Sequence, residues 1–133
     1  MYEKFGQFID GKWQKSENGQ TYDVINPATE EVLGKASKAS ENDINKALKS
    51  AEKGLEVWRK TPPWERAKII RKISELIRER SGVLAQWLTL EVGKPLAEAA
   101  GEVGGAADIF EWNSEETKRI YGQIVESRFE NTR

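Results

Sequence analysis

Residues 22–35, YDVINPATEEVLGK, predict two short strands joined by a tight turn. Apolar residues stand on both sides of Asn-Pro-Ala-Thr, and Pro27 presets φ for the second position of a turn. We therefore expect a strand over residues 22–25 and a returning strand that begins at Val32. A shorter hairpin is expected upstream, because Asp10-Gly11 separates residues 7–9 from residues 12–14 and suits a turn with φ > 0 at both central positions.

Three long helices are predicted after these hairpins. Ser40 and Asp43 form a capping box that opens the first helix. Its apolar stripe consists of Ile44, Ala47, Leu48, Ala51, Leu55 and Trp58. Thr61 is expected to cap the second helix, which Ser81-Gly82 interrupts and Gly93 ends.

The third helix is predicted from Pro95 to about Tyr121. Its apolar face consists of Leu96, Ala100, Val103, Ala107 and Phe110. A neighbouring strip of Ala97, Gly101 and Gly105 predicts close tertiary contact, because each helical glycine costs about 1 kcal/mol relative to alanine. Glu115 and Arg119 are spaced to pair, Gly122 is expected to close the helix, and residues 123–127 to form a strand.

Composition limits the chemistry. The 133 residues suit one domain, and 21 basic against 22 acidic residues give a net charge of −1, which favours neither nucleic acid nor an anionic membrane as a partner. No stretch is apolar enough to cross a bilayer and no signal peptide is recognisable. A chain without cysteine forms no disulfide, and we therefore expect a cytoplasmic protein. The chain has neither cysteine nor histidine, which excludes a thiolate nucleophile, an imidazole base and a zinc–sulfur site.

Three motifs with possible chemistry favour structural interpretations. The glycines of residues 101–110 lack the spacing and the strand–helix context of a dinucleotide-binding loop. Gly93-Lys94 precedes Pro95, which lacks an N–H, and a helix-to-helix turn is the better interpretation. A basic run with interleaved glutamates is interpreted as a solvated face with i,i+4 pairs; it comprises Arg66, Lys68, Arg71, Lys72, Arg78 and Arg80.

The order and wording of several segments resemble one family. They are FIDGKW, VINPATEEVLG, WERAKIIRKISELI, LTLEVGKPLAEA and EETKRIYG, and the match as a whole runs over about residues 8–127. These segments are similar to the opening part of the NAD(P)-dependent aldehyde dehydrogenases, and the branch that they resemble is the succinate-semialdehyde type.

The resemblance implies a fold and a division of the chain. The fold class is α/β: N-terminal β-hairpins and three long helices, an incomplete part of an aldehyde dehydrogenase-like nucleotide-binding domain. Residues 1–122 would belong to that domain, and residues 123–133 would begin the arm that joins the sheet of a neighbouring subunit.

The resemblance also implies a chemistry for the whole enzyme. A thiolate attacks the aldehyde, hydride passes to NAD or NADP, and the thioester is hydrolysed. Family chains are several-fold longer, and their catalytic and nucleotide-binding residues have no counterpart here, so no catalytic or cofactor-binding residue is assigned and this chain alone is expected to bind no NAD(P).

One site of the family does have matching positions. Many members bind a structural monovalent cation through main-chain oxygens before the Asn-Pro turn and an acid before the Gly-Lys-Pro turn. The resemblance therefore assigns Val24, Ile25 and Glu91 to a Na+ or K+ site. Carbonyl and carboxylate oxygens are suitable ligands for such hard cations.

Two hypotheses of function follow. In the first, the chain is the N-terminal portion of an oxidoreductase for an aldehyde such as succinate semialdehyde, is inactive alone, and has the rest of that enzyme chain as its partner. In the second, it is a stand-alone helical module that self-associates or docks onto a longer chain, because its apolar helix faces need cover.

Overall fold

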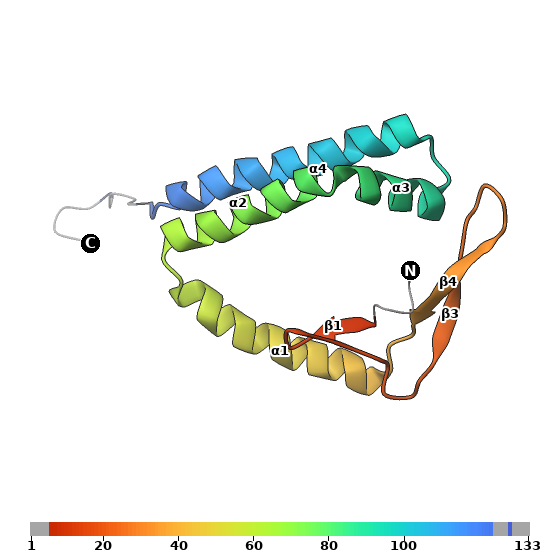
Figure 1. The fold of residues 1–133 in the computed structure, drawn as a ribbon. Coiled ribbons are helices and arrows are strands. Elements are labelled where there is room, and N and C mark those ends of the chain that lie inside the picture. The colour runs from red at the N-terminus through yellow and green to blue at the C-terminus, as the bar shows by residue number, and fades with distance from the viewer. Residues whose placement is uncertain (1–5, 124–127, 129–133) are drawn as a thin grey trace.

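The structure, a computed structural model, describes residues 6–123 and 128. In the described part of the chain, two hairpins precede four helices and a short 3-10 helix (Figure 1). The elements are β1 (Gln7–Ile9), β2 (Lys12–Gln14), β3 (Thr21–Ile25), β4 (Val32–Ser37), α1 (Glu41–Lys60), α2 (Pro63–Glu79), α3 (Ser81–Val92), α4 (Leu96–Glu116) and η2 (Thr117–Arg119).

Both predicted hairpins are confirmed. β1 pairs antiparallel with β2, and Asp10 and Gly11 have φ of 54° and 74°, the positive values that the two-residue turn requires. β3 pairs antiparallel with β4 in a second sheet of its own. The two hairpins thus form separate ribbons rather than one continuous sheet.

The start of α1 is confirmed as a capping box. The backbone N–H of Asp43 donates to Ser40 Oγ at 3.2 Å, and the backbone N–H of Ser40 donates to Asp43 Oδ2 at 2.9 Å. These bonds satisfy donors that a helix N-terminus otherwise leaves without partners. Glu41 and Asp43 in the first turn and Arg59 and Lys60 in the last also complement the helix dipole.

The predicted cap of α2 is wrong by one residue. Pro62, not Thr61, stands at the N-cap, and Pro63 is the first helical residue. Since a residue that precedes proline is driven to extended backbone, Pro62 (ψ 146°) cannot join the helix that Pro63 begins. Thr61 instead closes α1, where its Oγ donates to the Val57 carbonyl at 2.9 Å.

The interruption of the second long helix is confirmed and lies at Arg80, one residue before the predicted site. α2 ends at Glu79, α3 begins at Ser81, and Arg80 between them has φ −102° and ψ 11°. Gly93 ends α3 in the left-handed conformation with φ 75°, as predicted from the sequence.

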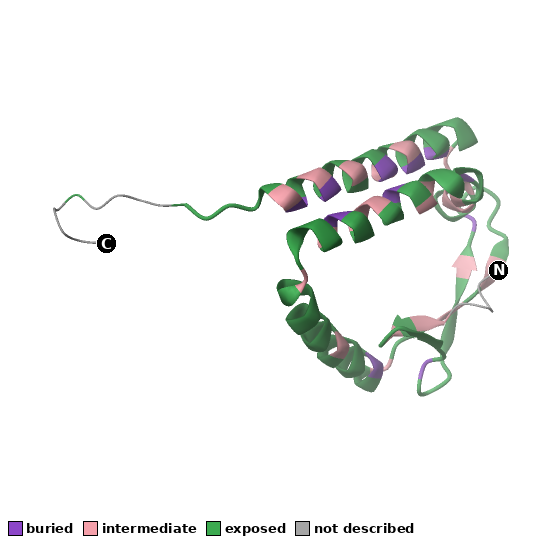
Figure 2. Cartoon of the chain, turned by 60° about the vertical axis from the view of Figure 1, so that its left-hand side comes forward, coloured by how far each residue is buried: buried purple, intermediate pink, exposed green. Residues whose placement is uncertain are grey.

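The core is a seam of small side chains between α4 and its two neighbours α2 and α3. In Figures 1 and 2, α2 and α4 lie side by side in opposite directions, and their buried residues face each other. Ala67 and Ser74 on α2, Ala85 on α3, and Ala99, Val103, Ala107 and Ser114 on α4 are buried. Ser74 Oγ donates to the Ala107 carbonyl at 2.8 Å, which requires the two backbones to approach closely.

The predicted packing face of α4 is therefore only partly correct. Val103 and Ala107 are buried, but Leu96, Ala100 and Phe110 are exposed. The close contact predicted for the strip with Gly101 and Gly105 is wrong for this chain, because a Cβ built at either glycine meets nothing within 4 Å. Ala99, Val103 and Ala107 form a parallel ridge of small residues, and it is this ridge that faces α2 and α3.

The end of α4 also differs from the prediction. The helix stops at Glu116 rather than near Tyr121 and continues as η2 to Arg119. Arg119 pairs with Glu116 at 2.7 Å instead of with Glu115, whose carboxylate accepts from Lys118 and Arg71. Apart from Gln123, the strand predicted over residues 123–127 lies outside the described residues and stays a prediction.

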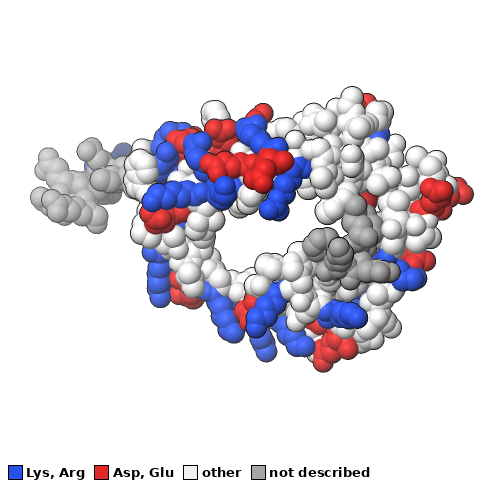
Figure 3. Space-filling view, viewed as in Figure 1, with Lys and Arg blue, Asp and Glu red and all other residues white. Residues whose placement is uncertain are grey.

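The described chain is open in the middle. The space-filling view shows an opening between the α2–α4 pair and α1, with the hairpins on one side (Figure 3). The buried apolar residues of the described chain are four alanines and one valine, whereas large apolar side chains such as Leu48, Leu55, Trp64 and Trp112 are 59–70% exposed. Most of the apolar surface that the helices offer is left uncovered.

Candidate functional site

The two turn motifs that carried the resemblance meet in the structure. The β3–β4 turn is organised by Asn26, which is 7% exposed and whose Oδ1 accepts from the N–H of Ala28 at 2.9 Å. Gly93, at the end of α3, lies against this turn so closely that a Cβ at Gly93 would be 2.9 Å from Pro27 Cγ. Segments more than 60 residues apart in sequence thereby share one contact.

The candidate cation ligands lie around this contact. Val24 and Ile25 are at the end of β3, where a bulge or irregularity in the pairing with β4 falls between them. Such an irregularity disrupts the ladder of hydrogen bonds locally, which suits carbonyl oxygens that bind something else. Glu91 is exposed on the last turn of α3, two residues before Gly93. The contact thus brings the two motifs together, and cation binding by these three residues stays a prediction.

Lys94, the lysine of the Gly-Lys-Pro turn, has a structural partner. Its ammonium pairs with Glu102 on the second turn of α4, and its side chain is 19% exposed. This pair ties the α3–α4 turn to α4. The turn therefore agrees with the interpretation as a helix-to-helix connection.

Asp43 accepts hydrogen bonds from two separate segments, of which the sequence predicts only the capping box. Besides its bonds within the capping box, its Oδ2 accepts from Ser16 Oγ at 2.9 Å and from the backbone N–H of Glu17 at 3.2 Å. The hydrogen bond from the Ser40 backbone is the largest cause that lowers the pKa of the Asp43 carboxyl, against the effect of burial. The side chain fastens the loop after β2 to the start of α1, a contact that no local pattern indicates.

A network of ion pairs crosses from α2 to α4. Arg71 pairs with Glu111 at 3.1 Å and also with Glu115, while Arg78 pairs at 2.8 Å with both Asp108 and Glu111. Arg78 first, and Arg71 second, hold the pKa of Glu111 below its usual range.

The sequence predicted i,i+4 pairs along this basic run, and that detail is wrong. Within α2 the lysines pair at i,i+3, as Lys68 does with Glu65, whereas Arg71 and Arg78 reach across to α4. All members of the network are partly exposed, so it positions the two helices more than it stabilises them.

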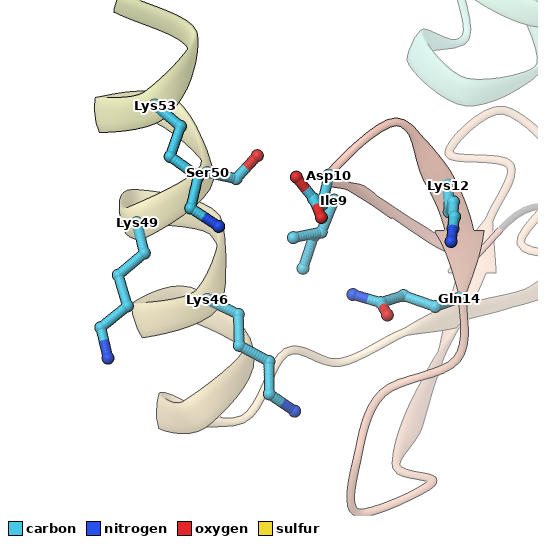
Figure 4. A pocket seen from close by; sticks show the side chains of 8 residues that line it. All are labelled: Ile9, Asp10, Lys12, Gln14, Lys46, Lys49, Ser50 and Lys53. Carbon is cyan, nitrogen blue, oxygen red and sulfur yellow. The ribbon is translucent and has the colours of Figure 1, made fainter. Parts of the chain in front are cut away.

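A cavity of about 390 Å³ lies between the first hairpin and α1. It is lined by Ile9, Asp10, Lys12, Gln14, Lys46, Lys49, Ser50 and Lys53 (Figure 4). Figure 4 shows Ile9, Asp10 and Gln14 directed toward the helix, while Lys49 points away from the hairpin. Lysines dominate the lining, and no pair of carboxylates is present that could act as acid and base.

The described residues contain no group of three or more His, Cys, Asp or Glu side chains that could hold a metal ion. No helix in this part of the chain is long and apolar enough to cross a membrane. The charged clusters that do exist join structural elements to one another. Among the residues that the structure describes, these clusters connect elements and bring together no convergent set of reactive side chains.

Comparisons with known proteins match this arrangement to larger enzymes. A family model described as the aldehyde dehydrogenase family matches residues 13–133. The glutarate-semialdehyde dehydrogenase of Pseudomonas aeruginosa is 43% identical over 118 residues, which is 89% of this chain and 24% of that protein. The NADP(+) succinate-semialdehyde dehydrogenase of Escherichia coli is 43% identical over 88% of this chain and 24% of its own.

A solved structure extends the match to three dimensions. The crystal structure of succinate-semialdehyde dehydrogenase from Burkholderia pseudomallei superposes with a TM-score of 0.90 at 38% identity, over 96% of this chain and 26% of that chain. This chain therefore spans about a quarter of the length of the relatives that it matches.

Proposed function

This chain belongs to the aldehyde dehydrogenase family, and from this membership we propose that it serves as the N-terminal portion of an oxidoreductase that converts a semialdehyde to the corresponding acid with NAD+ or NADP+. Succinate and glutarate semialdehyde are the proposed substrates. The observation that carries this proposal is 43% identity to two semialdehyde dehydrogenases across nearly nine-tenths of this chain. The E. coli relative, whose name includes NADP+, supports the choice of cofactor class.

Within such an enzyme these residues have a structural role. The sequence has no cysteine and no histidine, and the described side chains form ion pairs and helix caps rather than a reactive cluster. The reactive groups are then supplied by the part of the enzyme that this chain does not span, and the chain alone is expected to be inactive. The stand-alone helical module is not favoured, because the family model covers residues 13–133.

Three finer assignments belong to the same proposal. Residues 1–122 would form the outer layer of the nucleotide-binding domain, and residues 123–133 would begin an arm that joins a neighbouring subunit in an oligomer. A Na+ or K+ ion would be held by the carbonyl oxygens of Val24 and Ile25 and by Glu91. Carbonyl and carboxylate oxygens are suitable ligands for such an ion. The bulge at Val24/Ile25 and the contact of Gly93 with Pro27 support a site at this position. The cytoplasmic location stays a prediction from the sequence.

A chimera tests the proposal. Residues of this chain replace the segment that they match in the P. aeruginosa glutarate-semialdehyde dehydrogenase, and NADH or NADPH formation is followed with glutarate and succinate semialdehyde. We expect turnover within about tenfold of the parent enzyme, because the catalytic part is unchanged and a conserved fold tolerates surface differences. The parent enzyme without its matched segment is the negative control. A chimera no more active than that deletion would contradict the proposal.

A further inference from the structure

α1 is a helix with two different sides. At 100° per residue, Ile44, Leu48, Leu55 and Trp58 fall on one side, together with Ala47 and Ala51. We call these six residues the α1 stripe. Ile44, Leu48 and Leu55 are 52%, 60% and 59% exposed, and even Trp58 is 36% exposed. The α1 stripe is thus apolar like the buried face of a helix, yet its large side chains are exposed to solvent.

The side opposite the stripe is already occupied. Lys46 and Lys53 lie about half a turn away from the centre of the stripe, and Ser50 lies about a third of a turn away. All three line the cavity that separates α1 from the first hairpin (Figure 4). Asp43 helps to hold the first hairpin on this side of α1, because its carboxylate accepts from Ser16 Oγ and from the backbone N–H of Glu17 in the loop after β2. The hairpin is held against the lysine side of α1 and does not cover the stripe.

Nothing else in the described chain covers the stripe either. Among the described elements, α1 makes its main contacts with β1. Figures 1 and 2 show that only its C-terminal end, which leads into α2, comes near the α2–α4 pair. The α1 position nevertheless agrees with the solved Burkholderia enzyme, since the superposition spans 96% of this chain with a TM-score of 0.90. That enzyme is nearly four times longer, because the match covers 26% of it. The part of that enzyme that this chain does not span is therefore long enough to cover the stripe.

We infer that the α1 stripe is the docking surface for the catalytic remainder of a family enzyme, and that this docking occurs even when the remainder is a separate polypeptide. The inference rests on the proposed function and adds the surface and the non-covalent mode of assembly. A second copy of this chain is the competing occupant. The catalytic remainder is the better-supported occupant, because the solved relative that this chain matches with a TM-score of 0.90 has about three-quarters of its length outside the match.

Split assembly tests the inference. This chain is co-produced with the P. aeruginosa enzyme that lacks its matched segment, and the mixture is analysed by size-exclusion chromatography with light scattering and by turnover of glutarate semialdehyde. We expect the two polypeptides to co-elute in equal amounts and to recover turnover. Leu48→Glu with Leu55→Glu is expected to weaken the assembly by about 100-fold or more, because it places two charges in the buried interface.

Matched controls make the result specific. Lys49→Glu with Lys53→Glu changes two residues on the opposite side of the same helix and should leave co-elution within about threefold of the parent. Ile44→Ser with Leu55→Ser removes apolar surface without adding charge and should also weaken assembly. Far-UV circular dichroism of each isolated variant checks that the helices are retained, as expected for substitutions at exposed positions.

The other outcomes overturn the inference in distinguishable ways. If the covalent chimera is active and the separate polypeptides do not assemble, the inference is wrong and the proposed function stands. If the stripe variants disrupt only a homodimer of this chain, the stripe belongs to a second copy and the inference is wrong. If the covalent chimera is itself inactive, the proposed function fails and the inference fails with it.

Discussion

Replacing Ala107 by Leu is expected to destabilise the α2–α4 pair by about 1–3 kcal/mol, the usual cost of overpacking a close-packed core. Ala107 is 0% exposed, and its carbonyl accepts the hydrogen bond from Ser74 Oγ at 2.8 Å. A leucine side chain would push the helices apart and lengthen that bond. Helix propensity contributes little, because Ala and Leu are both strong helix formers.

Urea unfolding followed by far-UV circular dichroism measures this effect. Ala100→Leu on the same helix is the matched control, because Ala100 is exposed in this chain and a leucine there meets solvent. We expect its free energy of unfolding to stay within about 0.5 kcal/mol of the parent value. Equal unfolding midpoints for the two variants would show that the small-residue seam is not the core of this chain.

Replacing Gly93 by Ala is expected to cost about 1–3 kcal/mol, because two separate effects act at one position. Gly93 has φ 75°, a conformation that residues with a Cβ adopt rarely, and the new Cβ would be 2.9 Å from Pro27 Cγ. The proline ring belongs to the β3–β4 turn and cannot rotate away. The substitution therefore strains the end of α3 and displaces the turn that it contacts.

The same chemical change at Gly82 is the control for Gly93. Gly82 lies in α3, and a Cβ there would meet nothing within 4 Å. Gly82→Ala should stabilise the chain by up to about 1 kcal/mol, since alanine favours a helix. Thermal melts of the two variants should therefore shift in opposite directions. A Gly93→Ala melt at or above the parent value would contradict the described contact between the two turns.

The elements predicted well from sequence are those fixed by local chemistry. Asp10-Gly11 adopts positive φ, Ser40 and Asp43 close a capping box, and Gly93 ends its helix in the left-handed conformation. Each depends on residues within one turn of each other, so a short sequence contains the whole cause. The start of α2 lies one residue beyond the predicted start, because Pro63 holds Pro62 in extended backbone.

The parts that sequence could not predict are contacts between distant segments. Small residues recur on two neighbouring strips of α4, and only the partner helices decide that the strip with Ala99 and Ala107 is buried while Gly101 and Gly105 are exposed. The ion pairs from Arg71 and Arg78 to α4 and the hydrogen bond from Ser16 to Asp43 likewise join distant segments, and no local pattern predicts them. Cation binding by Val24, Ile25 and Glu91 also requires the ion itself. This site therefore stays a prediction.

The exposed helix faces explain why local and tertiary patterns disagree. The periodicity of α1 predicts a buried face, yet the α1 stripe is largely exposed in this chain. The apolar periodicity of a helix reflects the surroundings in which the helix is normally packed. The solved relative that this chain matches is about four times as long and offers more such surroundings. The pattern is thus informative about the larger enzyme.

Turnover measured on this chain by itself tests directly whether its residues carry reacting groups. The purified chain is incubated with succinate or glutarate semialdehyde and with NAD+ or NADP+, and reduced nucleotide is measured by absorbance, with the P. aeruginosa enzyme as the positive control. We predict a rate equal to the protein-free blank, because the proposed function assigns a structural role to these residues and places the reacting groups outside the part that they match. A reproducible rate above the blank that scales with the concentration of this chain would contradict that claim.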